Sequence, residues 1–269
     1  MFWNAKNGCV SIDDTDMDYV SFGEGKDVFI MLPGLGDGLT TVKNMAVPLA
    51  FTYRMYARDY KVYLFSRKNH LTAGYSTKDM AADLAKAMKK LSITKAKVLG
   101  VSQGGMIAQH LAIDYPELVE KLVLAVTLSR QNDRVQSVVQ KWIGLAKEGN
   151  YKALMVDTAE HSYSENYLKK YRLLYPLLGK VGKPKDFDRF IIQASSCICH
   201  DTYASLDQIQ CPVLVIGGDC DKIVGAASST EMADKIKDCR LHMYQGLGHA
   251  AYEEAEDFHQ RILQFFGVR

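Results

Sequence analysis

The sequence predicts an α/β fold with a mainly parallel central sheet and flanking helices. Short apolar runs rich in β-branched residues recur along its 269 residues, and stretches with helical spacing of apolar residues alternate with them. One long stretch carries only helical patterns, which predicts a helical lid over the sheet. The runs expected to form parallel strands span 27–32, 61–65, 97–101, 121–126, 212–216 and 240–244.

The remaining elements follow from the same patterns in chain order. Strand-like segments at 10–12 and 19–22, joined by polar turns, predict an antiparallel start to the sheet. Later stretches with amphipathic spacing are expected to form helices that cover the sheet: 77–91, 103–115 and 256–266.

The lid accounts for the domain organisation that we predict. Residues 1–127 form the first part of the α/β core, residues 128–205 form a helical cap or lid, and residues 206–269 complete the core. Within the lid, apolar residues at helical spacing predict helices at 135–147, 151–159, 165–178 and 187–199.

Composition excludes several classes of function. The 33 Lys and Arg against 31 Asp and Glu give a formal net charge of +2, which predicts no nucleic acid or anionic membrane as a partner. No run approaches the roughly 18 apolar residues of a membrane span. No secretory signal pattern is visible either, so we expect a cytoplasmic protein with reduced thiols.

The cysteines do not predict a metal site. Cys197, Cys199 and His200 form a compact cluster, but zinc sites need four ligands and usually wider spacing. No second pair of cysteine or histidine residues follows at matching spacing. We therefore expect small buried side chains on a helix here, with neither metal nor other cofactor.

The sharpest local signal is the segment 100–104, Gly-Val-Ser-Gln-Gly, which matches G-x-S-x-G. An apolar strand precedes it and an amphipathic helix follows it. A strand that turns sharply into a helix exposes the hydroxyl of Ser102 at the carboxyl edge of the sheet, and the tight turn requires small neighbours. Ser102 is thus a candidate nucleophile.

A serine nucleophile needs a base, and the base needs an acid to hold its tautomer. Of the seven histidines, His249 alone lies in a glycine-rich loop after the last expected strand, at the same sheet edge as Ser102. The acid is Asp219 or Asp221, because both follow the strand at 212–216. The residue not used by the site is expected to satisfy backbone amides in a turn.

Acyl transfer also needs donors for a developing oxyanion. The backbone amide of Gln103, directly after the nucleophile, is expected to be one of them. The other is expected from the glycine-rich loop at 32–38, whose glycines allow the backbone to approach a ligand closely. This loop lacks the Gly-Lys-Ser/Thr ending of a phosphate-binding loop.

The chain resembles the α/β-hydrolase superfamily over nearly its whole length, above all its small, capped esterase-like and lactonase-like members, enol-lactonases and carbon–carbon bond hydrolases included. The likeness rests on FIMLPGLGDG, on VLGVSQGGMIAQHLAIDYPELVEKLVLAVT, and on CPVLVIGGDCDKIV with GLGHAAYEEAEDFHQRILQFF. It implies that Asp221 is the acid, that the amide of Leu35 is the second oxyanion donor, and that the helical insertion is a lid.

Two segments depart from the superfamily pattern. Pro33 stands where many members have histidine, and FSRKNH at 65–70 replaces the usual Asp-x-Arg-Gly-x-Gly-x-Ser stretch. Both lie beside the expected site, so the resemblance does not imply a substrate. A serine nucleophile also disfavours haloalkane dehalogenases and epoxide hydrolases, which attack with a carboxylate.

The sequence therefore predicts a serine esterase without a cofactor, which cleaves a carboxylic ester or lactone of a small, partly hydrophobic substrate through an acyl-enzyme on Ser102. The same triad is compatible with carbon–carbon bond cleavage, or with acyl transfer to peroxide or an alcohol. A non-catalytic receptor on this fold is the alternative from another class. Lid residues expected either to line the pocket or to pack in the lid interior are Trp142, Met155, Tyr163 and Tyr167.

Overall fold

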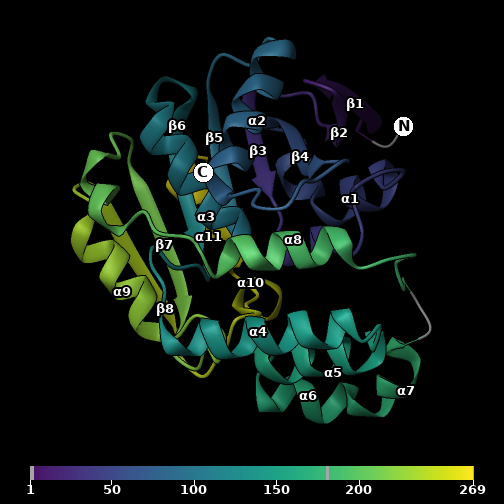
Figure 1. Ribbon diagram of the computed structural model, residues 1–269. Coiled ribbons are helices and arrows are strands. Elements are labelled where there is room, and N and C mark those ends of the chain that lie inside the picture. Colours follow the sequence, from purple (N-terminus) through teal and green to yellow (C-terminus); the bar gives the residue numbers. More distant parts are fainter. Residues whose placement is uncertain (1–2, 180–181, 269) are drawn as a thin grey trace.

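The computed structural model describes residues 3–179 and 182–268 and contains a single eight-stranded sheet (Figure 1). The strand order is β1-β2-β4-β3-β5-β6-β7-β8. The strands are β1 (Lys6–Ile12), β2 (Thr15–Phe22), β3 (Asp27–Leu32), β4 (Tyr60–Lys68), β5 (Ala96–Val101), β6 (Val119–Ala125), β7 (Val213–Gly218) and β8 (Cys239–Tyr244). β1 and β2 pair antiparallel, as do β2 and β4, and the other neighbours are parallel. The predicted α/β fold is confirmed.

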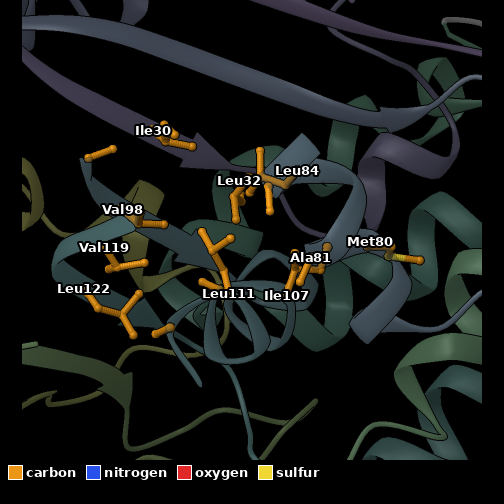
Figure 2. Packing of buried hydrophobic residues seen from close by; sticks show 14 of the residues in the cluster. Ile30, Leu32, Met80, Ala81, Leu84, Val98, Ile107, Leu111, Val119 and Leu122 are labelled. Atoms are coloured by element: carbon orange, nitrogen blue, oxygen red, sulfur yellow. The ribbon is translucent and has the colours of Figure 1, made fainter. Parts of the chain in front are cut away.

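Both faces of the central strands β3, β5, β6 and β7 are largely buried, which explains why these strands are mostly apolar, whereas the edge strand β8 is partly exposed. Within β3, Phe29 and Met31 belong to one apolar cluster, whereas Ile30 and Leu32 belong to another. Figure 2 shows part of the second cluster, in which strand residues meet Leu84 of α2 and Leu111 of α3. The helices that cover the sheet are α1 (Ala46–Thr52), α2 (Thr77–Lys90), α3 (Gln103–Asp114), α9 (Ala226–Lys235), α10 (Ala251–Glu254) and α11 (Phe258–Phe266).

Three of these helices were not predicted: α1, α9 and the four-residue α10. α1 spans seven residues, contains Pro48 and leaves Phe51 60% exposed, so it has no regular apolar stripe. α9 begins Ala-Ala-Ser-Ser-Thr, and small polar residues of this kind produce little hydrophobic periodicity. Short 3₁₀ helices include η1 (Leu35–Gly38), η2 (Arg54–Tyr56), η3 (Pro116–Leu118) and η5 (Tyr203–Gln208).

A group of helices follows β6 and ends before β7, and Figure 1 shows α8 running between the other members and the sheet. Side chains of Asn132, Asn150 and Ser164 accept hydrogen bonds from first-turn amides and so fix three of the helix starts. The group consists of α4 (Asp133–Lys147), α5 (Tyr151–Ser162), α6 (Glu165–Tyr171), η4 (Arg172–Leu174), α7 (Tyr175–Leu178) and α8 (Asp188–Cys197).

One predicted lid helix is wrong in its continuity. The stretch 165–178 was expected to form a single helix, but it is divided into α6, η4 and α7. Pro176 lies in the first turn of α7 and has no amide hydrogen. Proline is compatible with a helix start but not with a helix interior, so the chain begins a new helix at this point.

The residues of the cluster Cys197, Cys199 and His200 differ in burial. Cys197 is buried and Cys199 is exposed. The ring of His200 is buried between two hydroxyls, with Nδ1 2.9 Å from Oγ1 of Thr77 and Nε2 3.3 Å from Oγ1 of Thr202. Within residues 3–179 and 182–268, no group of three or more His, Cys, Asp or Glu side chains is arranged to hold a metal ion.

In the same ranges, no helix has the length and apolarity needed to cross a bilayer.

Burial of His200 predicts a pH-dependent contribution to stability. Burial, with the nearby ring of His110, lowers the pKa of His200 to about 3. Between that value and the ordinary histidine pKa of about 6.5, the unfolded chain binds a proton here that the folded protein does not. Acidification through this range therefore destabilises the fold, by at most about 1.4 kcal/mol per pH unit.

We expect His200→Asn to flatten the pH dependence of the free energy of unfolding between about pH 6.5 and 4, because the titrating ring is gone. Urea titrations at several pH values, with the exposed His70→Asn as the control variant, measure this slope. Equal slopes in the two variants would contradict the assignment.

Candidate active site

Ser102 lies in a strained turn between β5 and α3, with φ at +53° and ψ at −118°. Such a conformation is rare outside glycine and persists only where the surroundings hold it. The amide of Ser102 donates to the carbonyl of Ala125 at 2.9 Å, and the hydroxyl of Thr127 donates to the carbonyl of Ser102 at 2.7 Å. The elbow is thus fixed to the neighbouring strand, β6, and to the residues that follow it.

A chain of hydrogen bonds connects Ser102, His249 and Asp221. Nε2 of His249 lies 2.9 Å from Oγ of Ser102, and Nδ1 lies 2.8 Å from Oδ2 of Asp221. An ionised carboxylate only accepts, so Nδ1 carries the hydrogen and Nε2 is left to accept from the serine hydroxyl. This is the tautomer that a general base acting on Ser102 requires.

The carboxylate of Asp221 is held in its ionised form. Burial alone would raise the pKa of Asp221, but the imidazole of His249 and the amides of Ile223 and Val224 outweigh burial and lower that pKa. Both amides donate to Oδ1, at 2.8 and 2.9 Å. Oδ2 therefore remains free to bind the histidine.

Asp219, the other candidate acid, has a different contact. Its Oδ1 accepts a hydrogen bond from the amide of Gly246 at 2.7 Å. Gly246 begins the glycine-rich loop that carries His249. Asp219 thus fixes the base loop through the main chain, in the turn role expected for the acid that the site does not use.

The loop after β3 passes directly over Ser102. A Cβ atom built on Gly34 would lie 3.3 Å from Cβ and 3.8 Å from Oγ of Ser102. Leu35 begins η1 and Gln103 begins α3, and an amide at the start of a helix has no acceptor within that helix. The two amides expected to bind an oxyanion therefore lie at two helix starts beside the nucleophile.

Sequence reasoning missed three charged residues beneath this loop: Asp37, Arg67 and Arg189. Oδ2 of Asp37 accepts from the amide of Arg67 at 3.1 Å and from Nη2 of Arg189 at 2.7 Å. Burial would raise the pKa of Asp37, but the two guanidinium groups lower it below its usual value. A signal was present, because Asp37 lies in the expected oxyanion loop and Arg67 follows an apolar run at the edge of the site.

The four candidate lid residues have different surroundings. Trp142 is buried and donates from Nε1 to Oδ2 of Asp157 at 2.9 Å, so it packs between α4 and α5. Met155 packs against the same apolar cluster as Trp142. Tyr163 and Tyr167 stack with ring centroids 4.4 Å apart. Hydrogen bonds or ring contacts described for these four residues do not join them to Ser102.

The apolar cluster around Trp142 extends from α4, α5 and α8 to the loops beside Ser102. It includes buried Ile223 and Val224, which follow Asp221, and Leu35 packs against it. The segments that carry Asp221 and Leu35 therefore share an apolar core with these three helices.

The end of α5 contacts the loop that carries His249. The carbonyl of Ser162 accepts from the amide of Ala250 at 2.8 Å. The amide of Ser164 donates to Oε1 of Glu254 at 2.9 Å, and the hydroxyl of Ser164 donates to Oε2. The hydroxyl of Tyr163 donates to Oε2 of Glu253 at 2.5 Å. The end of α5 and the residues after it are thereby bonded to the residue before α10 and to its last two residues.

Comparison with known proteins gives consistent matches over nearly the whole chain. A family model described as alpha/beta hydrolase fold matches residues 27–256. The 2-hydroxy-6-oxononadienedioate/2-hydroxy-6-oxononatrienedioate hydrolase of Pseudomonas sp is 26% identical over 270 residues, which cover 96% of this chain and 92% of that protein. The serine hydrolase BPHL of Mus musculus is 25% identical over 267 residues, which cover 96% of this chain and 84% of that protein.

Solved structures show the same fold. MGS-M2, an alpha/beta hydrolase enzyme from a Medee basin deep-sea metagenome library, has a TM-score of 0.84 at 22% identity and covers 97% of this chain and 98% of its own. The enol-lactonase from Burkholderia xenovorans LB400 has a TM-score of 0.80 at 19% identity and covers 96% of this chain and 99% of its own.

The packing of the elbow predicts opposite effects for two Gly-to-Ala substitutions. A Cβ atom on Gly104 would lie 2.1 Å from the carbonyl oxygen of Leu32, so Gly104→Ala must push the elbow away from the oxyanion loop. We expect a loss of about 1–3 kcal/mol in the free energy of unfolding.

Gly144, inside α4, is the matched control because an added Cβ atom there meets nothing within 4 Å. We expect Gly144→Ala to stabilise the protein by about 0.5–1 kcal/mol. Urea unfolding measures both variants, and an equal effect of the two would contradict the close approach.

Proposed function

The chain belongs to the alpha/beta hydrolase fold family, and we propose that it is a serine hydrolase that cleaves a carboxylic ester or lactone of a small, partly hydrophobic molecule. The observation that carries this proposal is the hydrogen-bonded chain from Ser102 through His249 to Asp221. It supplies a nucleophile, a base in the required tautomer and a carboxylate that stabilises the imidazolium. The remaining requirement is a set of oxyanion donors, for which we assign the amides of Leu35 and Gln103.

Acylation follows from this arrangement. Oγ of Ser102 attacks the carbonyl carbon while Nε2 of His249 removes the hydroxyl proton. The carbonyl oxygen becomes an oxyanion between the two amides. The intermediate then collapses, the bond to the alcohol oxygen breaks, and the imidazolium returns its proton to that oxygen. An ester releases an alcohol at this stage, whereas a lactone stays attached as a hydroxyacyl group.

Deacylation repeats the same proton transfers with water as the nucleophile. His249 removes a proton from water as it attacks the acyl carbon, and a second tetrahedral intermediate forms. Its collapse breaks the bond to Oγ, which takes the proton back from the imidazolium. The carboxylic acid leaves and Ser102 is restored.

The lid supports the choice of substrate. We assign residues 128–205 to a cap that covers Ser102, with Trp142 and Met155 in its apolar interior. Tyr163 and Tyr167, stacked at the cap border, are further candidates for the pocket wall. A wall of this composition favours an apolar acyl or alcohol group over a charged one.

Two cations contact the oxyanion loop. Arg189 binds the carboxylate of Asp37 and main-chain carbonyls, whereas Arg67 binds the carbonyl of Pro33 and the side chain of Gln103 through Nη2 alone. Nε and Nη1 of Arg67 are buried and have no hydrogen-bond partner among the described residues. The choice of an uncharged substrate therefore rests on the apolar cap and not on these cations.

Carbon–carbon bond hydrolysis is the second candidate. Its specific support is the relative from Pseudomonas sp, a hydrolase of an oxononadienedioate that matches over 96% of this chain. The same nucleophile and base would serve a vinylogous ketone, with a carbon leaving group in place of an alkoxide. The named substrate of that relative is a dicarboxylate, for which the apolar cap of this chain is a poor match.

Substitution of the nucleophile tests the mechanism. We expect Ser102→Ala to reduce turnover of p-nitrophenyl butyrate by at least about 10³-fold with the fold retained, because removing a triad member leaves only binding and oxyanion stabilisation. A fluorophosphonate probe followed by mass spectrometry should place one adduct on Ser102 of the wild-type protein. Undiminished turnover in the variant would end the proposal.

Paired substrates test the specificity. We expect kcat/KM for p-nitrophenyl butyrate to exceed that for p-nitrophenyl hemisuccinate at least tenfold, because an apolar wall disfavours the second carboxylate. The third substrate is a 2-hydroxy-6-oxo-dienoate, whose cleavage is followed by loss of its absorbance. Faster cleavage of the dienoate than of any ester would favour carbon–carbon bond hydrolysis.

A further inference from the structure

A buried polar network lies beneath the oxyanion loop and joins four segments of the chain. It connects η1, the end of β4, the start of α3, and α8. Its members share almost complete burial although all are polar or charged. Among them, Asp37 and Arg67 are each 3% exposed, Gln103 and Gln193 are 0% exposed, and Ser196 is 5% exposed.

The carboxylate of Asp37 holds one side of this network. Its Oδ2 accepts from the amide of Arg67, from Nη2 of Arg189 and from Nε2 of Gln193 at 3.1 Å. A buried carboxylate stays ionised only where opposite charge and donors outweigh the cost of burial. The pair of guanidinium groups meets that condition, so the loop is anchored to β4 and to α8 at once.

A single nitrogen of Arg67 joins the two segments that carry the expected oxyanion donors. Its Nη2 donates to the carbonyl of Pro33 at 2.7 Å and to Oε1 of Gln103 at 3.0 Å. Pro33 lies two residues before Leu35, and Gln103 carries the other amide itself. The bond from Arg67 therefore spans the gap across which both amides must face one oxygen atom.

The side chain of Gln103 has no freedom to adjust. Its Nε2 donates to the carbonyl of Gln193 at 2.8 Å and to Oγ of Ser196 at 3.2 Å. Its Oε1 is thus turned toward Arg67. Loss of the guanidinium would leave the buried Oε1 of Gln103 and the part-buried carbonyl of Pro33 without this donor.

We propose that Arg67 is a positioning residue of the oxyanion hole, which sets the spacing between the amides of Leu35 and Gln103 by binding Pro33 and the side chain of Gln103. The inference rests on the proposed function, since an oxyanion forms only if Ser102 attacks a carbonyl. Oxyanion donors act within about 2.7–3.1 Å of the oxygen. A small change in the spacing of the two amides therefore weakens binding of the transition state more than binding of the substrate.

Arg67→Lys tests this role because it keeps the positive charge beside Asp37. The shorter side chain, with one compact ammonium group, cannot reproduce the guanidinium geometry toward both acceptors. We expect kcat for p-nitrophenyl butyrate to fall about 10- to 10²-fold, with KM changed by less than about threefold. The inhibition constant of a butyl trifluoromethyl ketone, whose serine adduct carries an oxyanion, should rise by the same factor as kcat falls.

Arg172→Lys is the matched control, because Arg172 binds Glu160 and Glu165 on the lid surface and its side chain is 39% exposed. We expect it to leave kcat and the inhibition constant unchanged. If Arg67→Lys does not fold, Gln103→Met replaces it, since this variant keeps the backbone amide and removes the acceptor for Arg67. The same parallel loss of kcat and inhibitor affinity is expected from it.

The outcomes separate the two proposals. A wild-type protein that neither turns over an ester nor reacts with a fluorophosphonate at Ser102 overturns the proposed function and this inference with it. A wild-type enzyme that is active, together with a folded variant whose kcat is unchanged, overturns the inference alone. The inference is also overturned if kcat of the variant falls while the inhibition constant of the trifluoromethyl ketone does not rise by a matching factor. A merely structural role of Arg67 would produce that result.

Discussion

The close approach of the elbow backbone to the end of β3 is the constraint on which the rest of the site depends. A Cβ atom on Gly104 would lie 2.1 Å from the carbonyl oxygen of Leu32, and one on Gly100 would lie 2.4 Å from that of Gly104. Only hydrogen atoms fit there. The approach lets two helices, η1 and α3, begin on either side of Ser102, so that the candidate nucleophile and two helix-start amides share one small region.

That constraint also explains what the sequence could predict. G-x-S-x-G between an apolar strand and a helix is a local pattern, and strand ends of a parallel sheet meet at one edge, so the close approach of His249 to Ser102 could be expected from the sequence. Asp219 and Asp221 lie two residues apart and share that local environment. Their difference depends on side-chain direction, since Asp221 reaches His249 while Asp219 turns to Gly246, and spacing does not encode direction.

The buried network escaped prediction for a related reason. Asp37, Arg67 and Arg189 are separated by tens of residues or more, and each one alone resembles an ordinary surface charge. Helix α9 was not predicted because its small polar residues give little hydrophobic periodicity. The break at Pro176 was not predicted because helical spacing of apolar residues continues across it. The central strands, by contrast, could be predicted because burial on both sheet faces makes most positions of β3, β5, β6 and β7 apolar.

The helices between β6 and β7 contact both halves of the proposed machinery. The chain leaves β6 beside the elbow and returns at β7 beside Asp221. Through Arg189 and Gln193, α8 holds Asp37 and the loop after β3. Through Ser162 and Ser164, the end of α5 holds the segment after His249. A displacement of these helices would therefore move the proposed oxyanion donors and the proposed base together, whereas helices that contact one side alone would disturb only one of them.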